Sequence, residues 1–355
     1  MNPKIEELDI KNNSSRANLL SRLTTTIKER TMDAYPKFLD RVNILLKRLQ
    51  IEKGTSIDLQ IFFTGHHSKE DAEGLDKVLE NSDIFFPEFV AWKPDVETIY
   101  NDLSQGHIAP ELAIKYLGEV YPPEEMNKIN DFHREFFKKL YNSQVAIGFV
   151  DLPYVHPLHS VKSDASSEAN KAFSAEHFDD MLIHLRSYLT GWHIFQTERE
   201  NYIIEHIPEK AVEIINRNSA LKKKTHVHLG MYLGAAHTPA YIDLRKKYGG
   251  AVRRHFPNPN PNSYTYTLFQ EYIRKLNFGK SLTNEEVAQV WVFYAALSSV
   301  EDDRDIEKVG HMISKYVKRL QLSEMRDIFN KMLALNEDDE EGARKILSQY
   351  LPIEH

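Results

Sequence analysis

The chain has 355 residues, of which 41% are hydrophobic and 27% charged, and its formal net charge is −7. A length of this order accommodates one large domain or two modest ones. The negative charge argues against a general nucleic-acid-binding surface, and no apolar run approaches the roughly 18 residues of a membrane-spanning helix. The sequence contains no cysteine, which excludes disulfides, cysteine-bound metals and thiol catalysis.

The first 54 residues are expected to form a helical extension. Residues 1–16 are polar and of mixed charge. They lack the apolar core of a signal peptide, so we expect a cytoplasmic protein. Residues 17–50 carry apolar side chains at helical spacing, and Pro36 divides them into two helices.

The stretch 57–90 predicts a strand, a turn, a helix and a second strand. The first strand is a short apolar run rich in β-forming residues, 57–63, and it ends in a turn that carries His66 and His67. A helix should begin after this turn, because Ser68 is a favourable N-cap. A second apolar run, 84–90, carries the carboxylate of Glu88 near its end.

Two further strands are predicted, at 144–150 and 226–233, and polar residues follow each of them. Asp151 follows the first, and the motif Gly-Ala-Ala-His, which ends at His237, follows the second. Helical patterns lie between the strands, as an insertion at 95–142 and a long segment at 175–216, whereas the Ser/Asp-rich stretch 155–170 is interpreted as a loop. A helix closed by Gly249-Gly250 follows His237.

These patterns predict an α/β fold in which residues 55–255 form a core with a mostly parallel sheet. The core has two related halves, because a strand, a histidine-bearing turn and a helix occur twice. A Pro/Asn-rich linker, 257–263, leads to a C-terminal region, 264–355, that is helical throughout.

Histidines and carboxylates thus follow the predicted strands, and parallel strands bring their carboxyl ends to one edge of the sheet. His66 and His237 with Glu88 would suit a divalent cation such as zinc, manganese, cobalt or iron, which would activate water for hydrolysis. Without a metal, a His–Glu pair could act as a general base. In the alternative interpretation, each histidine caps a helix or fills a polar pocket.

Four segments in this order resemble the TraB/Tiki proteins, which belong to a broader set with erythromycin-esterase-like and ChaN-like haem-binding proteins. The segments are FFTGHHSKEDAEGLDKVL with DIFFPEFV (62–90), AIGFVDLP (146–153), TERENYIIEHI (197–207) and YLGAAHTPAYIDLRKKYG (232–249). One position departs from the pattern, because Phe63 stands where the family motif has glycine.

The resemblance implies an α/β core of two related halves and hydrolysis of a peptide or ester bond. It implies His66 and His237 as metal ligands or bases, Glu88 as a ligand or general base, and Arg199 as the partner of an oxyanion or carboxylate. It also brings Asp151 and Tyr202 into the candidate catalytic set. The expected partner is a peptide or a small-molecule ester. The alternatives are a ChaN-like haem or iron carrier and a degenerate, non-catalytic interaction protein.

Overall fold

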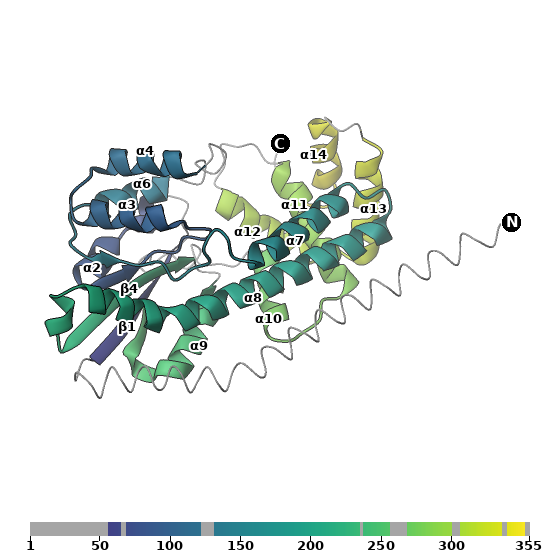
Figure 1. Ribbon diagram of the computed structural model, residues 1–355. Helices are drawn as coiled ribbons and strands as arrows, with labels where there is room; N and C mark the ends of the chain where they lie inside the picture. Colours follow the sequence, from purple (N-terminus) through teal and green to yellow (C-terminus); the bar gives the residue numbers. More distant parts are fainter. Residues whose placement is uncertain are drawn as a thin grey trace, which may run out of the picture. The chain divides into compact units, whose positions relative to one another are not determined.

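The computed structural model describes residues 56–64, 69–121, 131–234, 237–255, 268–299, 306–335 and 339–351 (Figure 1). The predicted N-terminal extension, the turn with His66 and His67, and the linker 257–263 lie outside the described residues. The chain divides into two compact units, Met1–Ser56 with Lys224–His226, and Ile57–Lys223 with Val227–His355. Apart from Ser56 and His226, which begin two strands, the described helices and strands belong to the second unit.

A five-stranded parallel sheet forms the centre of the α/β core, as predicted. Its strands are β1 (Ser56–Thr64), β2 (Ile84–Phe86), β3 (Ala146–Ile147), β4 (His226–Gly234) and β5 (Val252–His255), in the spatial order β3-β2-β4-β1-β5. The register pairs Leu59 with Val252, and Phe85 with Gly230. All five strands therefore end at one edge of the sheet.

Two strands are shorter than predicted and one was missed. The runs 84–90 and 144–150 contain only three and two strand residues, because their second halves leave the sheet as loops. The missed strand is β5, in which Val252 alone is buried and the next three residues are exposed. Such a segment lacks an apolar pattern, and its extended form depends on pairing with β1.

Helices cover both faces of the sheet. The 3₁₀ turn η1 (Lys69–Ala72) and the helices α2 (Leu75–Glu80), α3 (Pro94–Ser104), α4 (Pro110–Val120) and α6 (Asp131–Leu140) share an aromatic core with Phe62, Phe85 and Tyr232. The helices α8 (Phe178–Arg217) and α9 (Thr238–Tyr248) share a second core with Ile61 and Leu229. Two 3₁₀ turns complete this part, η2 (Leu221–Lys223) and η4 (Gly249–Ala251). Parallel strands buried on both faces read as continuous apolar runs, as residues 84–86 of β2 and 61–63 of β1 do.

The stretch 155–170, interpreted as a loop, instead belongs largely to the helix α7 (Leu158–Phe173). Its buried side chains, Ala165 and Ala172, are small and widely spaced, so the sequence shows little amphipathic signal. The helix packs against α8 at close range, since a Cβ atom at Gly191 would lie 3.0 Å from that of Ala165. Tertiary contact with α8 thus stabilises a segment whose composition favours a loop.

The helix α8 is 40 residues long and contributes to two separate hydrophobic cores. Its first half, from Phe178 to Leu189, packs with the C-terminal helices, and its second half, from Ile203 to Ile215, packs against the sheet. Arg199 and Glu200 lie between these two apolar stretches.

The C-terminal region is helical, as predicted. Its helices are α10 (Leu268–Asn277), α11 (Asn284–Ser298), α12 (Ile306–Val317), α13 (Leu322–Leu333) and α14 (Glu340–Ser348). A capping box, in which Thr283 and Glu286 bond each other's backbone N–H groups, begins α11. None of the helices that the structure describes is both long and apolar enough to cross a membrane.

Candidate active site

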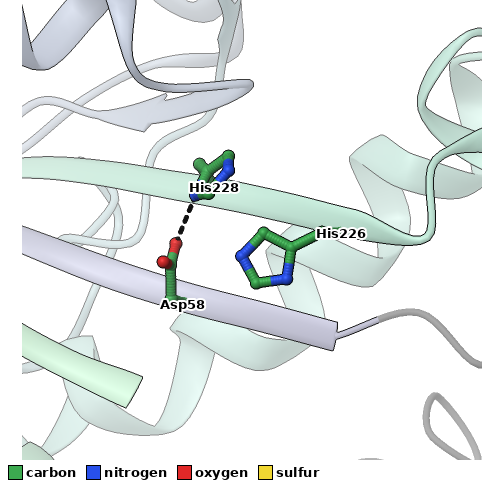
Figure 2. A group of neighbouring side chains, drawn as sticks. All are labelled: Asp58, His226 and His228. Atoms are coloured by element: carbon green, nitrogen blue, oxygen red, sulfur yellow. Dashed lines mark hydrogen bonds and ion pairs between the residues drawn. The ribbon is translucent and has the colours of Figure 1, made fainter. Parts of the chain in front are cut away.

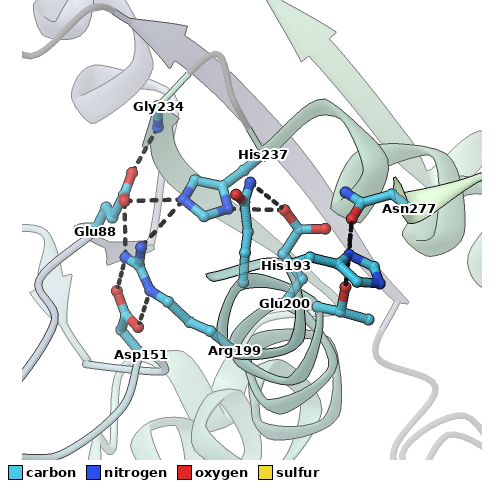
Figure 3. Close-up of polar contacts among 10 residues, drawn as sticks. Glu88, Asp151, His193, Arg199, Glu200, Gly234, His237 and Asn277 are labelled. Carbon is cyan, nitrogen blue, oxygen red and sulfur yellow. Dashed lines mark hydrogen bonds and ion pairs between the residues drawn. The ribbon is translucent and has the colours of Figure 1, made fainter. Parts of the chain in front are cut away.

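Four of the predicted site residues meet at the carboxyl edge of the sheet (Figure 3). Glu88 lies in the loop after β2, Asp151 follows β3, and His237 begins the helix after β4. Arg199 reaches them from the middle of α8. The polar residues that end separate strands in the sequence are therefore brought together, as the parallel arrangement predicts.

Arg199 binds two carboxylates at once. Its Nε and Nη2 atoms donate to the two oxygens of Asp151 at 2.8 and 2.5 Å, and Nη2 also donates to Glu88 Oε1 at 2.7 Å. This is the fork geometry in which a guanidinium matches a carboxylate. Burial opposes the charge of Arg199, but the charges of Asp151 and Glu88 outweigh it and raise the pKa of the guanidinium.

His237 is held through both ring nitrogens and is 5% exposed. Its Nδ1 lies 3.0 Å from Glu200 Oε1, and its Nε2 lies 3.1 Å from Glu88 Oε1 and 3.2 Å from Arg199 Nη1. Burial lowers the pKa of the imidazole. The charge of Glu88 and the hydrogen bonds to Glu200 and Glu88 outweigh this effect and raise the pKa to about 9. The ring is therefore an imidazolium at neutral pH.

Hydrogen bonds that involve the backbone fix the positions of the two loop residues Glu88 and Asp151. Trp92 Nε1 donates to the carbonyl of Asp151 at 2.7 Å, which ties the loop after β2 to the loop after β3. Tyr232 of β4 donates its hydroxyl to the carbonyl of Glu88 at 3.2 Å, and the backbone N–H of Gly234 donates to Glu88 Oε2. Three neighbouring strands thus orient Glu88 toward the centre of the cluster.

Glu200 is a member of the cluster that sequence reasoning missed. It is 5% exposed, and besides His237 it accepts a hydrogen bond from Gln196 at 3.3 Å. A signal was present, because Glu200 occupies the same helical stripe as Ile203, Ile204 and Ile207, which are all buried. A carboxylate in an apolar stripe needs a buried partner. The identity of that partner, 37 residues away, depends on the tertiary fold.

One predicted residue that the structure describes, Tyr202, is not part of the hydrogen-bonded cluster. The ring of Tyr202 stacks on that of His206, with centroids 3.7 Å apart, and contacts His156 at 4.9 Å. Burial and the charge of Asp151 raise the pKa of Tyr202. No hydrogen bond joins its phenol to the described residues of the cluster. His66 lies outside the described residues.

Phe63, which replaces the motif glycine, is an ordinary core residue of β1. Its side chain is fully buried, and its ring meets that of Tyr241 edge to face with centroids 6.4 Å apart. Its φ angle is not positive, so the backbone at this position does not require glycine.

The described donors of the predicted metal site, Glu88 and His237, already lie against a fixed positive charge, and the third predicted ligand, His66, lies outside the described residues. Arg199 Nη1 already lies 3.2 Å from Nε2, and the same guanidinium occupies Glu88 and Asp151. A divalent ion at Glu88 and His237 would lie against this fixed positive charge, and it would need a neutral imidazole.

A second histidine–carboxylate contact lies toward the amino ends of the strands (Figure 2). His228 Nδ1 of β4 and Asp58 Oδ1 of β1 are 2.8 Å apart. Figure 2 also labels His226, which belongs to the other compact unit. Asp58 and His228 by themselves are fewer ligands than the three or four of a zinc site.

No protein-family model, no curated protein and no solved structure matches the chain.

Proposed function

We propose that the protein hydrolyses an ester or peptide bond by acid–base chemistry at the cluster of Glu88, Arg199 and His237. The observation that carries the proposal is the contact of His237 Nε2 with Glu88 Oε1 at 3.1 Å, beside the guanidinium of Arg199. It joins a proton donor, a proton acceptor and a fixed positive charge. The resemblance to TraB/Tiki and erythromycin-esterase-like sequences points to the same reaction class.

His237 is the general acid in this proposal. With a pKa of about 9, its ring carries a proton at neutral pH and can deliver it to the oxygen or nitrogen of the leaving group. Glu200 has the role of a positioning residue, since its bond to Nδ1 orients the ring and stabilises the imidazolium.

Glu88 is the proposed acceptor of the proton from the attacking water. The water oxygen forms a bond to the acyl carbon, and the bond from that carbon to the leaving group breaks. The proton then held by Glu88 returns to His237 along their direct contact, which restores both groups. Arg199 Nη1 is the guanidinium nitrogen that does not bond a carboxylate, so it is placed to stabilise the developing oxyanion.

The proposed chemistry uses no metal at this cluster, because the guanidinium supplies the positive charge that a cation would otherwise provide. A peptide or a small-molecule ester is the proposed substrate.

The test is a hydrolysis assay of the full chain against nitrophenyl esters, lactones and unstructured peptides. His237→Gln should lower kcat at least about 100-fold, because the general acid is lost. For the active substrate, kcat/KM should fall as the pH rises past about 9, and incubation with EDTA should leave the rate unchanged.

His184→Gln is the matched control. This histidine of α8 is also paired with a carboxylate, Glu168 of α7, at 2.8 Å, but it is only half-buried and bonds no described residue of the cluster. Equal activity in the His237 and His184 variants would refute the assignment of His237. Activity lost with EDTA and restored by a divalent ion would refute the metal-free chemistry.

A further inference from the structure

A second candidate binding site lies in the C-terminal helices, away from Glu88, Arg199 and His237. It is an open cavity of about 750 Å³ between α10, α11 and α12, hereafter the C-terminal cavity. Its volume is within the range of about 300–1,000 Å³ that is usual for small-molecule sites. None of its lining residues belongs to the candidate active site.

The C-terminal cavity is strongly basic in a chain whose net charge is −7. Its charged lining side chains are five cations and two carboxylates: Arg274, Lys275, Lys280, Lys315, Lys318, Glu271 and Glu286. The five cations line one concave surface, where their fields add up.

The two carboxylates are already neutralised. Lys275 Nζ bonds both oxygens of Glu286, at 2.5 and 2.7 Å, and Lys318 forms an ion pair with Glu271. Lys280 and Lys315 form no ion pair with any residue that the structure describes. They come from different elements, the loop after α10 and the helix α12, and yet line the same cavity. An anion bound by Lys280 and Lys315 would therefore gain two positively charged partners, and no existing ion pair would have to break.

The cavity also has an apolar side. Phe278, in the loop after α10, is 63% exposed, although the ring is large and apolar. The guanidinium of Arg274 lies over the ring of Phe278, 5.7 Å from its centroid. An exposed ring beside unpaired lysines is suited to a ligand that combines an anionic group with a flat apolar one.

We propose that the C-terminal cavity binds a small organic phosphate, with Lys280 and Lys315 on the phosphate group and Phe278 against the apolar part. Such a site would give the helical region a ligand of its own, independent of hydrolysis at the sheet edge.

The experiment is a ligand-observed NMR titration of the full chain with phenyl phosphate and, separately, with inorganic phosphate. Lys280→Gln and Lys315→Gln should each weaken phenyl phosphate binding about two- to fivefold, and the double variant about tenfold. Phe278→Ala should weaken binding of phenyl phosphate and leave inorganic phosphate unchanged. All three side chains are exposed, so these variants should fold.

Lys222→Gln is the control, because it removes the same charge from an exposed lysine outside the cavity. Unchanged affinity in this variant, with losses in the cavity variants, supports the site. The proposal is overturned if phenyl phosphate shows no saturable binding up to ~10 mM. It is equally overturned if the double variant binds as tightly as the unaltered chain.

Discussion

Arg199 is the residue on which the charge balance of the buried cluster depends. The cluster contains the carboxylates of Glu88, Asp151 and Glu200, with one guanidinium and one imidazole. Buried charges are tolerated when each has a partner, and removal of one partner leaves the others uncompensated. The interactions of Arg199 therefore determine both the stability of the cluster and the orientation of Glu88.

Arg199→Ala is expected to lower the free energy of unfolding by about 3–5 kcal/mol, because Asp151 and Glu88 lose their counter-charge. Arg199→Lys should recover part of this loss, since lysine retains the charge but not the fork. Urea denaturation measures both values. Arg217→Ala is the control, as Arg217 pairs with Glu213 on the surface of the same helix and should cost about 1 kcal/mol or less. An Arg199→Ala value as small as the control would contradict the role assigned to Arg199.

His237 should make the stability depend on pH. Its pKa is about 9 in the folded protein and 6.5 in the unfolded chain, so the folded state binds the proton more tightly. The stabilisation is fully present below pH 6.5 and is lost as the pH rises through about 9. Urea denaturation between pH 6 and 10 should show this decline, of the order of 3 kcal/mol, and His237→Gln should reduce its slope. A slope that is identical in the variant would show that other groups cause the decline.

At the scale of elements, β4 has the central place. It lies between β2 and β1 in the sheet, so its end is flanked by the loop that carries Glu88 and by the end of β1. Close packing of β4 against its neighbours positions His237, and one glycine permits that packing. A Cβ atom on Gly230 would lie 2.8 Å from Phe85 Cδ2 and would also overlap Ser82 Oγ.

Gly230→Ala should therefore destabilise the protein by about 1–3 kcal/mol, because the buried ring of Phe85 has little room to shift. Thermal or urea unfolding measures the loss. Gly250→Ala serves as the control, since nothing lies within 4 Å of a Cβ atom at that position, and it should change stability by at most about 0.5 kcal/mol. Equal stability of the two variants would mean that the strands separate easily to admit a methyl group.

At the scale of the whole described fold, α8 connects two hydrophobic cores. Its first half is part of the core of the C-terminal helices, and its second half is part of the core beneath the sheet. Arg199 and Glu200 lie between these halves, so both cores support the helix that carries the site. A continuous helix transmits the loss of packing at one end to the other when the two parts unfold together.

Leu185→Ala should cost about 2–5 kcal/mol, because the side chain is fully buried in the core of the C-terminal helices. Hydrogen exchange should then become faster in both halves of α8, residues 178–190 and 203–217. Ile183→Ala, on the same helix but 62% exposed, should leave both halves unchanged. Faster exchange confined to 178–190 would show that the two cores unfold independently.

Much of the candidate site could be predicted from the sequence because its signals are local. Short apolar runs that end in a polar residue predict buried strands, and parallel strands bring their ends to one edge. On that basis Glu88, Asp151 and His237 were expected together. The helical insertion and the helical C-terminal region also follow from local periodicity and agree with the described helices.

The tertiary structure alone decided the features that depend on distant partners. The strand β5 has three exposed residues and exists through pairing with β1, and α7 is a helix because small side chains let it lie against α8. The sequence placed Arg199 and Glu200 next to each other on one helix but left their partners open. The fold directs Arg199 to Glu88 and Asp151, and Glu200 to His237. Buried charges pair with whichever group the packing brings within reach, and local sequence does not encode that proximity.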